Sequence, residues 1–293
     1  MSGSMQGQVA WLFSRHRGTG ESRRAWKDAN QGFGKMADVT FAWNSERRYK
    51  CTSIEFVEWA QGRYGLSEIR EVTPPMAKVY IEERQARGLS PRTLATDITG
   101  LRRLGLYLVL EQWHTQNFVP DDLSVPHGSH PRYSYMPEHA KKIIEHVAKR
   151  DERAAQVLRW QLDCGLRISE AIRLRPDRVD FDAGTIEVKG KGGKKRMIKV
   201  SDRMLLDQLP RSGTFPLLNG NATSWTRQIE KLVAAACAEL DIKCLGTHGF
   251  RASAAQRTLD DLLESGVDER SARKQVSRLL GHNRTSVTRS YAP

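Results

Sequence analysis

Long apolar runs are absent from this chain of 293 residues. The longest, LVAAACAEL at residues 232–240, is far shorter than the roughly 18 residues that a membrane-spanning helix needs. The N-terminal stretch MSGSMQGQVAWLF has no basic segment followed by a long apolar one, so we expect no secretory signal. These absences argue against a membrane protein and against a secreted one.

Cysteine is also sparse and unpatterned. The four cysteines are Cys51, Cys164, Cys237 and Cys244, and no two of them form a CxxC pair. Cys237 and Cys244 have no histidine partner at the spacing of a zinc site. We therefore expect neither a structural metal site nor a disulfide framework, and a reducing cytoplasm fits this usage best.

Acidic residues are too few to balance the basic ones. The chain has 47 Lys and Arg against 34 Asp and Glu, which gives a formal net charge of +13. Such a surplus predicts a polyanionic partner, either nucleic acid or an anionic membrane surface. Without a membrane-spanning or secretory segment, nucleic acid is the preferred interpretation.

Hydrophobic periodicity separates an N-terminal arm from a helical domain. Residues 1–44 are rich in Gly, Arg and Trp and weakly periodic, so we expect a mobile basic arm with a short helix near 22–29. In residues 45–120, apolar side chains recur at three- and four-residue spacing. Ser90 and Pro91 there form a good N-cap and first helical residue. We predict a small all-helical domain at 45–120.

Prolines then interrupt the pattern. They are Pro120, Pro126, Pro131 and Pro137, and helices do not run through such spacing. We interpret residues 121–136 as an interdomain linker. Residues 137–293 combine helix signals with one hairpin near 184–200. The expected fold class is mainly α, with a helical first domain and a mostly α second domain that holds a small antiparallel sheet.

Two basic positions in the second domain are candidate anion ligands. Arg167, in CGLRISEAIRL, begins a helix, where backbone N–H groups and an arginine can bind an anion. The alternative is a surface arginine paired with Glu170. Lys191, in KGKGGKKR, lies between Gly190 and Gly192 on the hairpin turn and could reach a phosphate. The alternative there is a solvated run of charge.

Two further motifs follow near the C-terminus. His248 and Arg251, in THGFR, are three residues apart at a helix start and so share a face. His282 follows Gly281 in LLGH, and Tyr291 stands nine residues later. Taken singly, each has a structural alternative, such as a capped core histidine or an ordinary terminal tyrosine.

Together these residues suit metal-free attack on a phosphodiester. Cations stabilise a pentavalent transition state, and a tyrosine hydroxyl can act as the nucleophile and leave a phosphotyrosyl link. No cluster of Asp and Glu stands at metal-binding positions. We therefore expect no metal and no other cofactor.

The motifs CGLRISEAIRL, KGKGGKKR, HGFR, LLGH and the tyrosine nine residues on resemble, in order and spacing, those of the tyrosine recombinases, the phage-integrase and Xer-like family. The resemblance is strong over 137–293. It is looser over 45–120, where ARGLSPRTLATDITGLRRL is similar to the family's helical, SAM-like core-binding domain. It implies a site-specific recombinase or integrase that acts on double-stranded DNA through a 3′-phosphotyrosyl intermediate.

The resemblance also implies roles for residues that bind the phosphate. Arg167 and Arg251 would clamp the scissile phosphate, and His282 would donate a hydrogen bond to it.

The remaining roles concern the nucleophile and the protons. Tyr291 would attack, Lys191 would protonate the leaving 5′ oxygen, and His248 would assist proton transfer at the tyrosine. Neither metal nor ATP would be needed. The partners implied are duplex DNA, a homo-tetramer assembled on that DNA, and accessory DNA-bending proteins.

Three features depart from the family pattern. The gap between Arg251 and LLGH is long, with DERSARKQ as the extra segment, and Ala252 stands where many members have a second histidine. Only Ala292 and Pro293 follow Tyr291, whereas most members continue into a helix that docks on a neighbour. We expect either a truncated chain or assembly through other surfaces, and a monomer in free solution.

Two other functions remain open at this point. A type IB topoisomerase uses the same cations and tyrosine to relax supercoils without joining two sites. A DNA-binding accessory protein of a mobile element would need no catalytic tyrosine at all.

Overall fold

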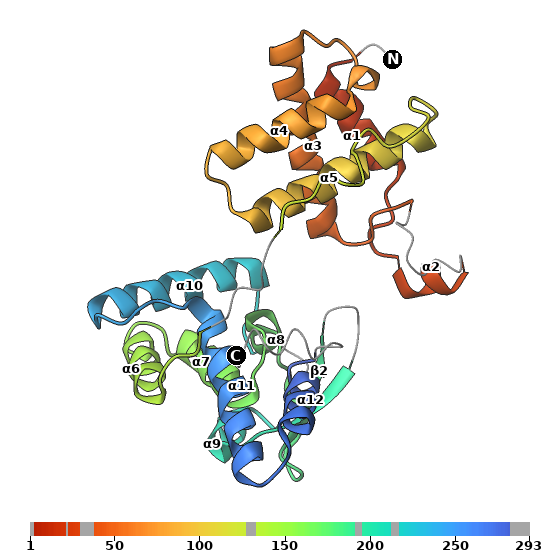
Figure 1. Cartoon of the computed structure of the whole chain (residues 1–293). Coiled ribbons are helices and arrows are strands. Elements are labelled where there is room, and N and C mark those ends of the chain that lie inside the picture. Colours follow the sequence, from red (N-terminus) through yellow and green to blue (C-terminus); the bar gives the residue numbers. More distant parts are fainter. Residues whose placement is uncertain are drawn as a thin grey trace. The chain divides into compact units, whose positions relative to one another are not determined.

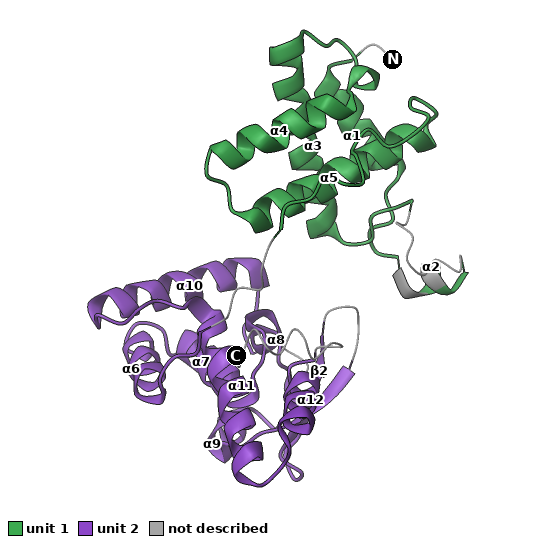
Figure 2. Ribbon diagram, in the orientation of Figure 1, with its two compact units in different colours: residues 1–128 green, residues 129–293 purple. Residues whose placement is uncertain are grey.

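The computed structural model describes residues 3–21, 23–29, 38–126, 133–190, 195–211 and 217–281. The chain divides into two units, residues 1–128 and residues 129–293 (Figure 2). Helices dominate both units, and the second holds one small antiparallel sheet (Figure 1). The expected fold class is confirmed.

The described part of the first unit is helical. Its elements are α1 (Met5–Arg15), α2 (Arg23–Ala29), α3 (Trp43–Tyr64), the 3₁₀ turn η1 (Ile69–Glu71), α4 (Pro74–Ala86) and α5 (Pro91–Leu110). Helix α5 starts as its sequence predicts, because the Ser90 hydroxyl accepts a hydrogen bond from the Thr93 backbone N–H at 3.2 Å. Gly100 lets α5 approach α3 closely, since a Cβ there would lie 3.2 Å from the Cβ of Thr52.

The structure differs from the expected mobile arm at α1. Met5, Val9, Leu12 and Phe13 of this helix are buried in the hydrophobic core of the first unit. Their spacing is that of one helix face, and Ser4 caps the first turn through a hydrogen bond from the Gly7 backbone N–H. This short amphipathic helix was not predicted from the sequence, because the prediction relied on the overall basic composition of residues 1–44.

The stretch expected as a linker, and the residues just before it, contribute to the packing of the two units. Phe118 and Val119 are buried in the core of the first unit, and the Arg102 guanidinium donates to the backbone oxygen of Leu123 at 2.9 Å. Tyr135, by contrast, is buried in the core of the second unit. Packing against the first core therefore extends to Val125, and packing in the second core begins by Tyr135.

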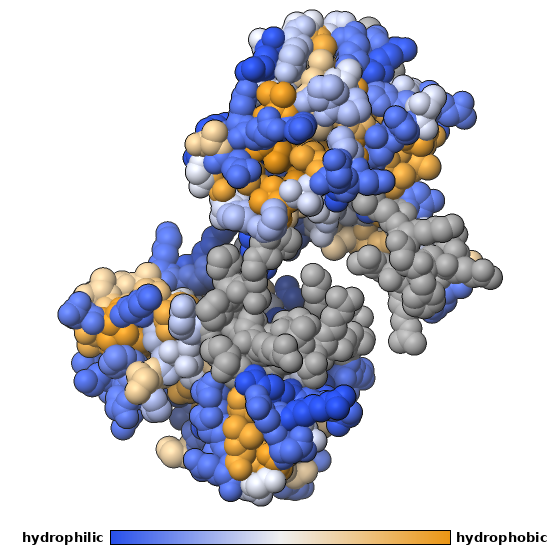
Figure 3. All heavy atoms as spheres, viewed as in Figure 1, coloured by the Kyte–Doolittle hydropathy of each residue, from blue (hydrophilic) through white to orange (hydrophobic). Residues whose placement is uncertain are grey.

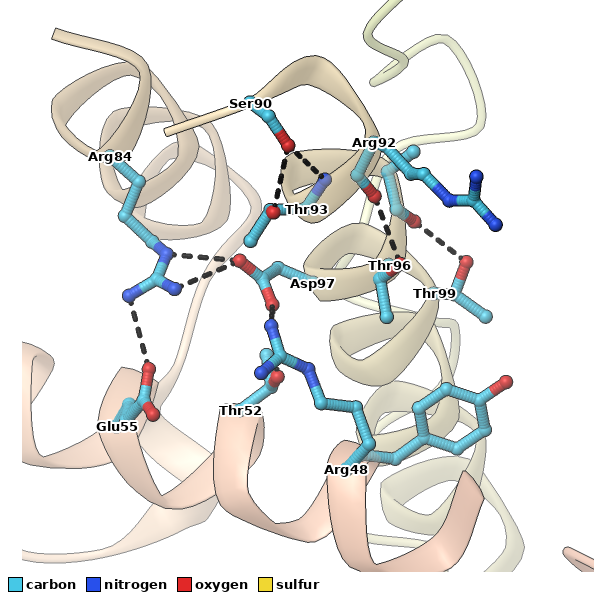
Figure 4. A network of polar contacts seen from close by, with 12 residues as sticks. Arg48, Thr52, Glu55, Arg84, Ser90, Arg92, Thr93, Thr96, Asp97 and Thr99 are labelled. Atoms are coloured by element: carbon cyan, nitrogen blue, oxygen red, sulfur yellow. Dashed lines mark hydrogen bonds and ion pairs between the residues drawn. The ribbon is translucent and has the colours of Figure 1, made fainter. Parts of the chain in front are cut away.

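A buried carboxylate joins three helices of the first unit (Figure 4). Asp97 of α5 has no exposed side-chain area, and it accepts hydrogen bonds from Arg48 of α3 at 2.8 Å and from Arg84 of α4 at 3.1 Å. The Thr52 hydroxyl donates a further bond at 3.1 Å. Because a buried charge is tolerated only when it is paired, these contacts fix how the three helices meet.

We expect Asp97→Ala to lower the free energy of unfolding by about 3 kcal/mol, the low end of the range for breaking a buried ion pair, because Arg48 can turn to water. Urea unfolding followed by circular dichroism measures this loss. Glu82→Ala, at an exposed position of α4, is the control and should change stability by under about 0.5 kcal/mol. Equal stability of the two variants would show that the network does not hold the unit together.

The second unit builds its core from helices laid against a sheet. Its elements are α6 (Pro137–Ala148), α7 (Glu152–Cys164), α8 (Ile168–Ile172), the 3₁₀ turn η2 (Pro176–Arg178), β1 (Val179–Asp180), β2 (Thr185–Lys189), β3 (Lys195–Lys199), α9 (Arg203–Asp207), α10 (Ala222–Glu239), α11 (Gly246–Glu264) and α12 (Glu269–Leu279). Trp160 of α7 is fully buried in this core, and the sheet adds Ile186 and Ile198.

The sheet contains the hairpin that the sequence predicts. Its strand order is β1-β2-β3, and both pairs are antiparallel, with Val188 opposite Arg196. Side chains of β3 alternate, because Met197 is exposed while Ile198 is buried. The expected hairpin at 184–200 is confirmed for its strands, and Lys191 between them lies outside the described residues.

Hydrophilic residues cover most of the described surface visible in Figure 3, with smaller hydrophobic groups between them. The described residues include no helix that is both long enough and apolar enough to cross a membrane.

Candidate active site

Glu170 is the centre of a charged cluster in the second unit. Its side chain is only 5% exposed, and its two carboxylate oxygens face three arginines: Arg167, Arg196 and Arg251. These arginines come from the start of α8, from β3 and from α11. Three guanidinium groups around one carboxylate leave the cluster with a net positive charge.

Arg167 is placed by the turn between α7 and α8. Helix α7 ends at Gly165, which adopts a left-handed φ of 60°, and Arg167 is the N-cap of α8. The Glu170 carboxylate accepts from the Arg167 backbone N–H at 2.8 Å and from Nη1 of its side chain at 2.9 Å. The side chain of Arg167 is 26% exposed, more than that of the other two arginines. It can therefore meet a ligand from solvent.

Helix α11 supplies the next two candidates. His248 is exposed in the first turn, and Arg251 is fully buried one turn later. Arg251 donates to the backbone oxygens of Gly165 and Leu280, and its Nη1 lies 3.8 Å from Oε2 of Glu170. This arginine joins the end of α7, the end of α12 and the cluster.

The first turn of α11 is held by Tyr135. Its hydroxyl accepts from the Leu245 backbone N–H at 2.8 Å and donates to the Gly246 backbone oxygen at 3.2 Å. A Cβ on Gly249 would lie 2.4 Å from the Tyr135 ring, so only glycine fits there. Burial raises the pKa of Tyr135 well above its usual value, which keeps the hydroxyl protonated and in a structural role.

Arg196 completes the cluster from β3. Its Nη2 and Nη1 donate to Oε2 and Oε1 of Glu170 at 2.8 and 3.1 Å, which makes a bidentate pair. Its Nε donates to the backbone oxygen of Leu279 at 2.9 Å.

Electrostatics keep Glu170 ionised. Burial alone would raise its pKa, but hydrogen bonds and charge from Arg196, with help from Arg167, outweigh burial and lower the pKa to about 2. The carboxylate is thus permanently negative near neutral pH and fixes the positions of the arginines around it. The remaining positive charge suits an anion with several oxygens, such as a phosphate.

The structure brings together part of the predicted site. Arg167 and Arg251 meet at Glu170, and His248 lies one turn from Arg251 on the same helix. The pairing of Arg167 with Glu170, which the sequence offered as an alternative to anion binding, is present within the same cluster. The other predicted residues, Lys191, His282 and Tyr291, lie outside the described residues.

Sequence reasoning missed Arg196 and the central place of Glu170. A signal was present for Arg196, because it shares the inward face of β3 with Ile198, and the buried Val200 continues the alternation just after the strand. A charged residue on the buried face of a strand needs a partner, whereas Lys195 and Lys199 on the other face do not. Among the described residues, no group of three or more His, Cys, Asp or Glu side chains could hold a metal ion.

The sequence of this chain is similar to those of characterised proteins. Residues 135–293, more than half of the chain, match the phage integrase family. Tyrosine recombinase XerC of Bacillus licheniformis is 26% identical over 258 residues, which cover 82% of this chain and 83% of the relative. Tyrosine recombinase XerD of Pseudomonas putida is 29% identical over 241 residues, which cover 72% and 74%.

Solved structures show the same fold. XerH recombinase bound to palindromic difH substrate, in a post-cleavage complex, aligns over 99% of this chain and 90% of its own, with a TM-score of 0.65 and 17% identity. A lambda integrase dimer bound to a COC′ core site aligns over 98% and 81%, with a TM-score of 0.64 and 15% identity. Because the family match spans more than half of its length, the chain belongs to the phage integrase family and is a tyrosine recombinase, an enzyme of site-specific DNA recombination.

Proposed function

We propose that this recombinase cuts duplex DNA by attack of the Tyr291 hydroxyl on a backbone phosphate. The new bond joins the tyrosine oxygen to phosphorus, and the bond to the 5′ oxygen breaks. The phosphate stays attached as a 3′-phosphotyrosyl link, so the bond energy is kept for rejoining without ATP.

The observation that carries the proposal is the arginine cluster around Glu170. In-line attack on a phosphodiester places added negative charge on the phosphate oxygens, and preorganised cations stabilise that charge. Arg167 is held in place by Glu170 and remains partly exposed, which suits a direct phosphate contact. Arg251 has no exposed area, so a direct phosphate contact by this residue requires the chain around it to open.

Protons need a donor and an acceptor in this reaction. We assign the proton for the leaving 5′ oxygen to Lys191 and the proton of the Tyr291 hydroxyl to His248, which is exposed at the start of α11. His282 would donate a hydrogen bond to the phosphate. The cations themselves stabilise the charge that a metal ion would otherwise balance.

The first unit would add DNA contacts of its own. We assign residues 45–120 to a core-binding domain, 137–293 to the catalytic domain and 121–136 to the connection between them. On α5, Arg92, Thr96 and Thr99 follow one another at helical spacing, and Arg92 is exposed (Figure 4). Arginine and threonine side chains commonly contact DNA phosphates, so this face is our candidate.

Duplex DNA is the partner that the relatives support, because the XerH and lambda integrase structures are both complexes with DNA. Four copies of this chain on two DNA sites, in the cytoplasm and with accessory DNA-bending proteins, complete the proposal. The biological role that we favour is recombination of the DNA of a mobile genetic element.

Covalent capture tests the function without a known target site. The protein is incubated with sheared DNA from its source genome, with EDTA and without ATP, and denatured complexes that retain DNA are sequenced. We expect the captured fragments to share one sequence. Two copies of that sequence on a plasmid should then recombine and delete the DNA between them.

Other outcomes would point to the competing functions. Capture without sequence preference, together with plasmid relaxation and no deletion, would indicate a type IB topoisomerase. Tight binding without any covalent capture would indicate an accessory DNA-binding protein.

A further inference from the structure

Arg196 links three separate segments of the second unit. It belongs to β3, its bidentate partner Glu170 belongs to α8, and Leu279, whose oxygen accepts from Nε, is the last residue of α12. All three guanidinium nitrogens are used, and the side chain is only 12% exposed. A residue with these contacts acts as a brace between the segments.

Each contact suits arginine and no other side chain. The guanidinium is planar, so two of its N–H groups match the two oxygens of a carboxylate while Nε points elsewhere. The Leu279 oxygen is one of the carbonyls left without a helical partner at the end of α12, where a cation is favourable. A lysine ammonium would keep the positive charge but would lose the planar pair of N–H groups that binds both carboxylate oxygens.

Gly281, which follows α12, lies directly against the Arg196 side chain. Gly281 adopts a left-handed φ of 65°, and a Cβ at this position would lie 3.1 Å from Nη1 of Arg196. His282 follows immediately in the sequence. Arg196 therefore lies against the last described residue before His282.

The same residue fixes the hairpin. Arg196 stands opposite Val188 in the β2–β3 ladder, and Lys191 belongs to the short connection between these strands. Because Arg196 is bound to Glu170, which also holds Arg167, the hairpin is anchored to the phosphate-binding arginine. Arg196 therefore ties β3, and with it the hairpin, to the same carboxylate that holds Arg167.

We infer that Arg196 is a positioning residue, which holds the β2–β3 hairpin against Glu170 so that the hairpin connection can deliver a proton to the leaving 5′ oxygen. This inference rests on the proposed function for its reaction. It assigns Arg196 no direct contact with the phosphate, only the placement of groups that make one.

The test compares two leaving groups in single-turnover cleavage. Duplexes carrying the captured site are made with either the ordinary 5′ oxygen or a bridging sulfur at the scissile phosphate. A thiolate leaves without protonation, so a defect in proton delivery shows only with oxygen. We expect Arg196→Lys to slow cleavage of the oxygen substrate about 10²-fold, the effect of a misplaced catalytic group, and to slow the sulfur substrate far less.

Two reference variants separate the possible causes. Arg178→Lys is the matched control, because Arg178 pairs with Glu187 of the same sheet at an exposed position, and it should cleave both substrates like the parent. Lys191→Ala tests the proposed proton donor itself, so absence of sulfur rescue in that variant would count against the proposed role of Lys191. Equal slowing of Arg196→Lys on both substrates, or no slowing, would overturn the inference about Arg196.

Folding is checked by thermal melting before the rates are compared. Should Arg196→Lys not fold, Arg196→Gln, which keeps amide N–H donors for Glu170, is measured with the same two substrates and judged by the same outcomes. DNA binding should be unchanged, because Arg196 is largely buried.

Discussion

Replacing Tyr291 by Phe should abolish the covalent protein–DNA product on a duplex carrying the captured site, while binding to that duplex stays nearly unchanged. The substitution removes one hydroxyl and no charge, so the basic surface that attracts DNA is intact. Without the hydroxyl no oxygen is available at this position to attack the phosphate. Denaturing gel electrophoresis of labelled DNA measures the product, and a mobility-shift assay measures binding.

Tyr133→Phe is the matched control for this experiment. Tyr133 is 60% exposed in the same unit, and its ring lies 5.3 Å from the Lys243 ammonium, a contact that phenylalanine keeps. We expect the control to form the covalent product at the normal rate. A product of normal intensity from Tyr291→Phe would show that another residue is the nucleophile.

Arg167→Ala should lower the cleavage rate on the order of 10²–10⁵-fold, the range for lost transition-state donors and arginine fingers. The loss should fall on the chemical step, because the transition state carries more negative charge on the phosphate than the bound substrate does. Arg196 keeps its two bonds to Glu170 in this variant, so the carboxylate is still paired and the fold should survive. Single-turnover cleavage at saturating protein measures the effect.

Arg173→Ala controls for the loss of one positive charge. Arg173 is exposed at the end of α8, close in sequence to Arg167 but outside the cluster around Glu170. A loss of similar size in both variants would indicate a general electrostatic effect on DNA binding in place of a specific role for Arg167.

Much of the fold was predictable because local signals are strong. The Ser90–Pro91 start of α5 and the strands of the hairpin both follow from short-range chemistry. The packing of α1 into the first unit was not predicted, because overall composition in residues 1–44 outweighed four well-spaced apolar residues.

The site was predictable as a set of residues and less so as an arrangement. Sequence spacing selected Arg167, His248 and Arg251, but it treated the Arg167–Glu170 pair and anion binding as alternatives. The structure shows that one carboxylate can organise several arginines and still leave net positive charge. Arg196 is far from Glu170 in sequence, and only the tertiary fold of the second unit brings them together.

The most direct test of the central claim is to identify the residue that carries the DNA. Trapped complexes are trimmed with nuclease, digested with trypsin and analysed by mass spectrometry. Cleavage after Arg289 would release a peptide that begins at Ser290, and we predict that this peptide carries the nucleotide on Tyr291. A nucleotide found on any other peptide would contradict the assignment of Tyr291 as the nucleophile.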